Sequence, residues 1–195
     1  MTATRQPRPT TCTVSQISLP QDARVLSTLS RIDYEDAFAV TADVHHTSEQ
    51  WVRAVLQDAP ASVRRQLWMG WTAIGLKLGP PWSGGRVLGW GVKHSDPGFV
   101  LLAADSWLGL RGQLLFRSEP YGLLFATFVQ QTNPVARALW AAITARHQHV
   151  VRSLLGHAAG RVSASAPFHG DDEFVMDRVS GGGQAVSEAL TTQES

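Results

Sequence analysis

Two residues have the type and the placement that chemistry would need. His147 falls on the apolar stripe of a long predicted helix, between Ile143 and Val150, so its imidazole is expected to point toward the interior. An imidazole changes charge near neutral pH and can orient a ligand or move a proton. Asp105 alternates with the apolar residues Phe99, Leu101, Ala103 and Trp107 in one predicted strand, which favours a carboxyl on the inner face of a sheet. Asp105 and His147 are therefore candidates for an acid and a base.

Both residues also have purely structural interpretations. A histidine on an apolar helix face is commonly a core residue bonded to a neighbour, and Asp105 can open a turn if its strand ends one residue earlier. Tyr34 and Asp36 share the inner face of the first predicted strand. There, Tyr34 can offer its hydroxyl to a ligand while Asp36 bonds to backbone at the strand end. The pattern leaves catalysis open.

The sequence predicts neither a metal site nor a cofactor. His147 and His149 are two residues apart on a helix, so they point about 200° apart and cannot chelate one ion. Cys12 is the only cysteine, which excludes an intramolecular disulfide and a Cys-rich zinc site. The phosphate-loop motif, HExxH and CxxC are all absent from the sequence.

Composition favours a folded, cytoplasmic protein. Hydrophobic residues make up 44% of the 195 residues and charged residues 17%, a balance typical of a chain with a core. With 17 Lys and Arg against 16 Asp and Glu, the bulk charge argues against nucleic-acid binding. The longest apolar runs reach about half of the roughly 20 residues needed to cross a bilayer, so no membrane span is expected. The N-terminal stretch lacks the unbroken apolar segment of a secretory signal.

The chain divides into three parts. Residues 1–15 are rich in Thr, Pro and Arg without a period and are interpreted as a mobile arm. Residues 16–159 form one domain. Residues 160–195, with the acidic run Asp171-Asp172-Glu173 and three consecutive glycines, are interpreted as a disordered tail. Alternatively, the acidic run folds back on the basic body or docks on a partner.

Hydrophobic periodicity predicts five strands and three main helices in the middle of the chain. The predicted strands cover residues 32–42, 88–94, 99–107, 110–117 and 123–131, and segment 79–86 has room for a further short one. A helical turn is expected at 22–26. Helices are expected from Thr47 to just before Pro60, from Pro60 to Gly79, and from Asn133 to Gly156 or Gly160. The last would run about 22–24 residues.

This order predicts an α+β helix-grip fold: a curved antiparallel sheet wrapped around the long C-terminal helix, with two short helices after the first strand. Because such a sheet curves, it leaves volume between its concave face and the helix. The residues expected to line that pocket are those whose periodicity points inward, namely Tyr34, Phe38, Trp71, Trp90, Leu101, Trp107, Leu114, Phe116, Phe125, Trp140, Ile143 and His147.

The element order, the stretch IDYEDAFAV at 32–40 and the stretch NPVARALWAAITARHQHVVRSLL at 133–155 resemble the START-like, helix-grip (SRPBCC) superfamily. The likeness is to a bacterial branch of it and covers residues 18–159. The superfamily includes pollen-allergen-type proteins, lipid-transfer START domains and polyketide cyclases. The resemblance implies an internal cavity for an apolar small molecule, but no single chemistry, since members bind, carry, cyclise or hydrolyse.

Three hypotheses follow. In the first, the protein binds an apolar or amphipathic small molecule as a carrier or sensor. In the second, it is a cyclase, dehydratase or hydrolase that uses Asp105 and His147 as acid and base. In the third, it is a partner-binding module that uses the acidic tail and has a collapsed cavity. The expected partner is a small apolar molecule rather than nucleic acid, and a homodimer is compatible with the sequence.

Overall fold

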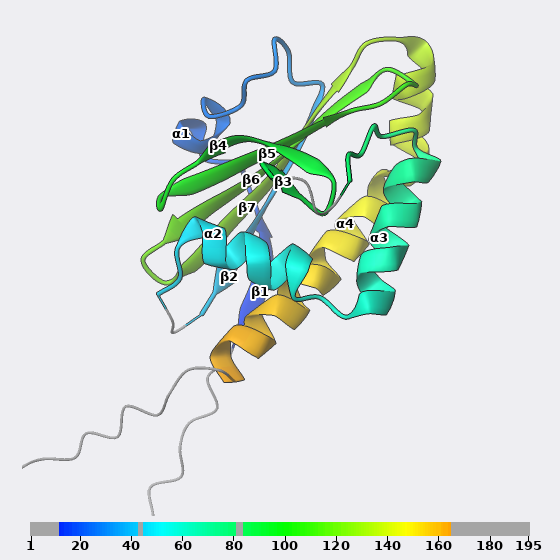
Figure 1. Ribbon diagram of the computed structural model, residues 1–195. Helices are drawn as coiled ribbons and strands as arrows, with labels where there is room; N and C mark the ends of the chain where they lie inside the picture. Colours follow the sequence, from blue (N-terminus) through cyan, green and yellow to red (C-terminus); the bar gives the residue numbers. More distant parts are fainter. Residues whose placement is uncertain (1–11, 43–44, 81–83, 165–195) are drawn as a thin grey trace, which may run out of the picture.

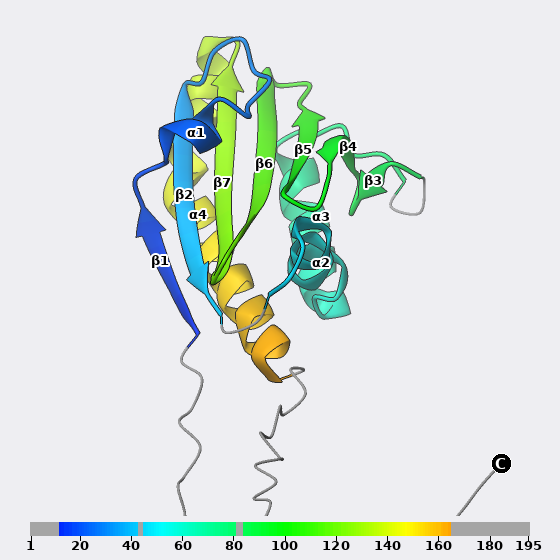
Figure 2. The same ribbon diagram turned by 90° about the vertical axis from the view of Figure 1, so that its left-hand side faces the viewer.

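The computed structural model describes residues 12–42, 45–80 and 84–164. They form one seven-stranded antiparallel sheet with the strand order β1-β2-β7-β6-β5-β4-β3, seen face-on in Figure 2. The strands are β1 (Thr13–Ile17), β2 (Tyr34–Thr41), β3 (Arg86–Val87), β4 (Trp90–Ser95), β5 (Phe99–Asp105), β6 (Leu110–Glu119) and β7 (Gly122–Gln131).

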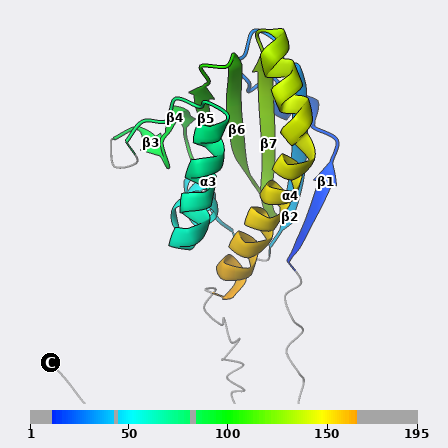
Figure 3. The ribbon, with the colours of Figure 1, turned by 90° about the vertical axis from the view of Figure 1, so that its right-hand side faces the viewer.

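The helices cover both faces of this sheet unequally. Long helix α4 (Pro134–Ala164) lies across one face, and α3 (Ala61–Ala73) lies on the same face beside it (Figures 1 and 3). Helix α2 (Ser48–Val52) continues into a π-helical segment, η1 (Arg53–Gln57). Short helix α1 (Gln21–Arg24) covers the opposite face (Figure 2). The predicted α+β helix-grip fold is confirmed. In the described part of the chain, no helix has the length and apolar character to cross a membrane.

Local sequence signals start the helices where they were expected. The Thr47 side chain accepts a hydrogen bond from the backbone N–H of Gln50, and the Gln50 side chain accepts one from the N–H of Thr47. This reciprocal capping satisfies two backbone donors that the first turn leaves free. At the start of α4, Oδ1 of Asn133 accepts a hydrogen bond from the N–H of Ala136 at 2.8 Å. Both predicted helix starts are confirmed.

Helix α4 is longer than predicted. It passes through Gly156 and Gly160 and ends at Ala164, a length of 31 residues. A glycine inside a helix costs about 1 kcal/mol, and burial of the last turns offsets this cost. Leu155, Ala158 and Val162 are buried in the main core, where α4 meets η1 and β1.

Two strands lie beyond the five that periodicity predicts. Strand β3 starts at Arg86, at the end of the segment that had room for a short strand. Strand β1 pairs with β2 from Thr13 onward, inside the range expected to be a mobile arm. Most β1 residues are exposed, so its sequence carries no apolar alternation, and the free backbone edge of β2 orders it instead. Residues 1–11 of the expected arm and 165–195 of the expected tail lie outside the described residues.

The sheet is buried on both faces, which corrects the predicted orientation of β5. Leu102 and Ala104 belong to the main core under the helices. Leu101 instead belongs to a second core with Leu115 and Phe128, packed beneath α1 and its flanking loop. When both faces of a strand are apolar, alternation cannot say which face is inside. The β5 residues that were expected to face the helices therefore lie on the opposite face of the sheet. The predicted inner faces of β2 and β6 are confirmed.

Gly122 provides a test of this sheet. It begins β7 with φ of 142°, and an added Cβ would collide with the carbonyl oxygen of Val40 in β2. We expect Gly122→Ala to lower the free energy of unfolding by about 2 kcal/mol, measured by urea denaturation. Gly156→Ala is the matched control, because a Cβ there meets nothing within 4 Å, and it is expected to raise stability by up to about 1 kcal/mol. Equal stability of the two variants would contradict the described β2–β7 contact.

Candidate functional site

A cavity of about 770 Å³ lies between the sheet, α3 and α4. This volume is within the range of about 300–1,000 Å³ that is typical of small-molecule sites. Most of its wall is apolar. The apolar lining residues include Val63, Leu67, Trp71 and Ile74 on and just after α3, Trp90, Leu110, Leu114 and Val129 on the sheet, and Trp140, Ile143, Val150 and Leu154 on α4.

The cavity opens to solvent between α3 and α4, which stand side by side over the sheet (Figure 3). Its lining includes the exposed side chains Gln66 and Met69 of α3 and Arg146 and His149 of α4. A smaller hollow of about 50 Å³ adjoins it toward η1, reaches Phe125, and shares His147 with the large cavity. The site is therefore an open apolar pocket rather than a sealed interior void.

The structure distributes the predicted lining residues over several places. Those on the wall of the large cavity are Trp71, Trp90, Leu114, Trp140, Ile143 and His147. Phe125 lines only the smaller hollow. Tyr34, Phe38 and Phe116 face the helices but pack in the core without lining the large cavity. Leu101 lies on the opposite face of the sheet.

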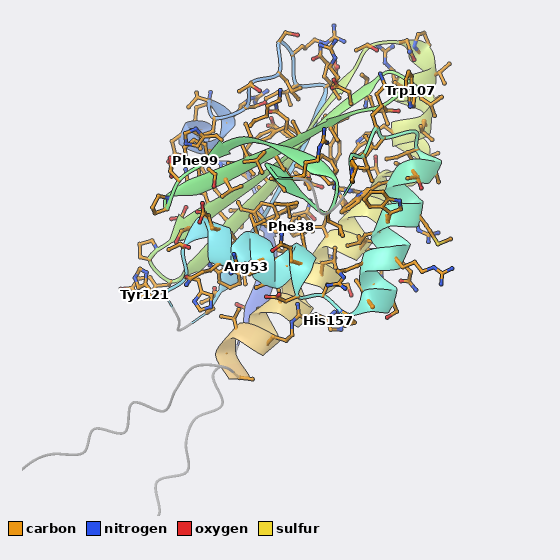
Figure 4. The ribbon with its side chains drawn as sticks, in the orientation of Figure 1. Phe38, Arg53, Phe99, Trp107, Tyr121 and His157 are labelled. Carbon is orange, nitrogen blue, oxygen red and sulfur yellow. The ribbon has the colours of Figure 1, made fainter. Side chains whose placement is uncertain are left out.

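Trp107 and Asp105 lie away from the cavity. Trp107 is 78% exposed, with Nζ of Lys77 3.9 Å from its ring centroid, and Figure 4 shows it at the periphery, far from the central Phe38. The Asp105 side chain is 65% exposed and lies 4.0 Å from Nε of Arg111. On β5, Asp105 points to the same side of the sheet as Leu101, which is the side away from α3 and α4. The structure therefore does not bring Asp105 together with His147.

His147 has a different acidic neighbour, Asp36. Asp36 of β2 is paired directly with Thr127 of β7, so both side chains point toward α4, and His147 lies over them. Nε2 of His147 is 3.3 Å from Oδ2 of Asp36 and 3.2 Å from Oγ1 of Thr127. The Asp36 side chain is only 1% exposed, against 19% for His147. The imidazole thus stands between a buried carboxyl and the cavity.

A hydrogen-bonded chain continues behind Asp36. Nε2 of Gln148 donates to the Tyr34 hydroxyl at 3.1 Å, and that hydroxyl donates to Oδ2 of Asp36 at 2.7 Å. Trp140 packs edge-on against Tyr34 with ring centroids 5.1 Å apart and lies at the same distance from the His147 ring. Within this chain Asp36 is buried, whereas Tyr34 and Gln148 are half-buried.

Burial and charge shape the chemistry of this cluster. Burial, followed by the hydrogen bond from the hydroxyl to Asp36 and the charge of Asp36, raises the pKa of Tyr34 above its usual value. Tyr34 therefore stays protonated and acts as a donor. Oδ1 of Asp36 is buried and has no hydrogen-bond partner among the described residues. A buried carboxyl with one oxygen left without a partner lowers the free energy of unfolding. Because such a group is unfavourable for folding, the cluster is a candidate for function.

Sequence reasoning placed Asp36 on the inner face but interpreted it as a strand-end residue, and it missed Thr127 and Gln148. A signal for Asp36 was present: it is the one charged residue between Tyr34 and Phe38 on an otherwise apolar strand face. Thr127 and Gln148 gave no such signal, because their roles arise only from the β2–β7 register and from the placement of α4.

No metal site is evident in the described parts of the chain, where no three His, Cys, Asp or Glu side chains gather to hold an ion. Comparison with protein-family models, with curated proteins and with solved structures finds no match for this chain. The cavity and its polar cluster are therefore the features of this chain that point to a function.

Tyr34 allows a spectroscopic test of the cluster. Tyr34 and Tyr121 are the only tyrosines, so Tyr121→Phe leaves Tyr34 as the single phenol. Its phenolate absorbance is expected to appear only above the ordinary tyrosine pKa of about 10. Adding Asp36→Asn is expected to lower that titration midpoint, because the substitution removes the nearby negative charge. Identical titrations of the two proteins would show that Asp36 does not act on Tyr34.

Proposed function

We propose that this protein belongs to the START-like, helix-grip superfamily and binds an apolar or amphipathic small molecule between its sheet and its helices. The observation that carries the proposal is the cavity of about 770 Å³ with a mainly apolar wall. Binding of an apolar ligand that displaces water from a surface of this kind is favourable, because apolar area is removed from water. The rings of Trp71, Trp90 and Trp140 suit a flat or aliphatic ligand body.

Charge around the opening favours a ligand with an acidic group. Helices α3 and α4 contain no Asp or Glu and together carry six arginines, Arg64, Arg65, Arg137, Arg146, Arg152 and Arg161. Arg146 lines the cavity, and in the described residues no carboxylate does so. An anionic head group would therefore meet a positive potential at the opening.

Native mass spectrometry of the purified protein tests the proposal directly, because a retained ligand would appear as added mass and reveal its chemical class. Tryptophan quenching by fatty acids, sterols and aromatic polyketides is the companion measurement, since three tryptophans line the cavity. No added mass together with no response to any of these compounds would favour the partner-binding hypothesis.

Filling the cavity should block binding. Gly70 lies on α3 and lines the cavity, and a Cβ there meets nothing within 4 Å. We expect Gly70→Leu to weaken binding of the neutral fluorophore N-phenyl-1-naphthylamine by about tenfold, equivalent to about 1.4 kcal/mol. Gly156→Leu, in equally open space on α4 but outside the cavity wall, should bind the fluorophore like the wild type. Equal affinities for the two variants would place the fluorophore elsewhere.

The preference for an acidic group has its own test. Dodecanoate and dodecanol share a tail and differ in the charge of the head, so we expect dodecanoate to bind about tenfold tighter at low ionic strength. Arg146→Gln should reduce this preference, whereas Arg137→Gln, a substitution on α4 outside the cavity wall, should preserve it. Equal binding of acid and alcohol by the wild type would refute the charge argument without affecting the cavity proposal.

A further inference from the structure

We propose that the cavity is also a proton-transfer site, in which His147 is the general base and Asp36 is the positioning residue behind it. The inference rests on the proposed function, because His147 can act only on a molecule that the cavity holds.

The hydrogen-bonded chain selects the tautomer of His147. Since Gln148 donates to the Tyr34 hydroxyl, that hydroxyl gives its own proton to Oδ2 of Asp36. The oxygen of Asp36 that lies 3.3 Å from Nε2 of His147 is therefore an acceptor. Nε2 also forms a hydrogen bond with Oγ1 of Thr127 at 3.2 Å. Because a lone pair on Nε2 would face the carboxylate oxygen, we infer that Nε2 carries the imidazole proton. The lone pair of a neutral imidazole is then on Nδ1. Nδ1 makes no hydrogen bond to any residue the structure describes, and the His147 side chain lines the cavity.

Asp36 also prepares the site for the charge that proton uptake creates. An imidazolium formed at His147 would face the Asp36 carboxyl, which is 1% exposed and has one oxygen without a partner among the described residues. Charge stabilisation is stronger where water is excluded. Asp36 thus both holds the ring and compensates its charge, the arrangement expected behind a catalytic histidine.

The other charged and titratable groups around His147 are few. Arg146, His149 and His157 of α4 line the same cavity, with His157 on the side of α4 toward α3 in Figure 4. Tyr34 and Asp36 reach His147 from β2. In the described parts of α3 and of strands β4, β6 and β7, no titratable side chain lines the cavity. Asp36 is therefore the negative group closest to His147.

The substrate class follows from an isolated base in an apolar pocket. A suitable substrate is an apolar molecule with a C–H bond made acidic by a neighbouring carbonyl. Nδ1 takes that proton, and the electron pair of the C–H bond moves onto the carbonyl oxygen as an enolate. His147 then returns the same proton to another carbon of the conjugated system, which regenerates the neutral imidazole. The overall reaction is an isomerisation, so it consumes no oxidant, reductant or second substrate.

A model proton abstraction tests the base without knowledge of the natural substrate. In 5-nitrobenzisoxazole, a base removes the C–H proton, the freed electron pair completes a nitrile, and the N–O bond breaks. The ring opens to a single coloured product, a nitrophenolate that carries the nitrile. We expect the wild-type protein to accelerate this reaction above an equal concentration of free imidazole, with a rate that rises with pH. We expect His147→Gln to lower the rate by about 100-fold.

Asp36→Asn separates a positioning role from a structural one. It is expected to lower the rate by about tenfold and to move the rate–pH profile, while binding of the unreactive analogue 5-nitrobenzotriazole, followed by tryptophan quenching, stays unchanged. The matched control is a second histidine–carboxylate pair, His94 and Asp96, whose atoms lie 2.6 Å apart on the exposed surface. His94→Gln and Asp96→Asn should leave the rate at the wild-type value.

The outcomes distinguish the two proposals. If the wild type binds the analogue but its rate is independent of pH or matches that of His147→Gln, the proton-transfer inference is wrong and the binding function stands. If the wild type neither binds the analogue nor accelerates the reaction, the binding proposal fails for this ligand class and the inference fails with it. Loss of rate in His147→Gln and Asp36→Asn with analogue binding retained would support both.

Discussion

The packing of α4 across strands β2 and β7 is the contact on which the rest of the structure depends. It buries the inner face of the sheet beneath Trp140, Val151 and Leu155. It also brings His147 over the Asp36–Thr127 strand pair. A polar cluster at such a junction is sensitive to position, because a shift of one residue in either strand would turn a side chain to the other face. The register between β2 and β7 therefore determines the position of the polar cluster beneath α4.

The cavity exists because α3 and the strands below it leave space that large side chains only partly fill. Gly112 of β6 lets the Trp90 ring lie close to the sheet, since an added Cβ would approach that ring to 3.3 Å. Trp90 in turn meets Trp71 of α3 edge-on, with ring centroids 5.4 Å apart. These two rings form part of the cavity wall and connect α3 to the sheet at one side of the cavity.

Burial on both faces of the sheet explains which sequence predictions failed. In β6, polar Arg111 and Arg117 alternate with apolar residues, and its predicted inner face is confirmed. In β5, every residue from Val100 to Ala104 is apolar, so both faces of the strand look alike in the sequence. The pattern could not show which face points toward the helices, and Asp105 was assigned to the wrong face. Strand β1 had no apolar pattern to detect, because the backbone edge of β2 orders it.

The sequence by itself determined the order of the main elements, the helix starts at Thr47 and Asn133, and the apolar stripe that carries His147. These features depend on local hydrogen bonds and on periodicity, which a chain carries in its residue order. Only the tertiary structure decided the partner of His147, because Asp36 and His147 are separated by more than half of the described chain. Their meeting depends on strand register, on the face that each strand buries and on the path of α4, and none of these is a local property.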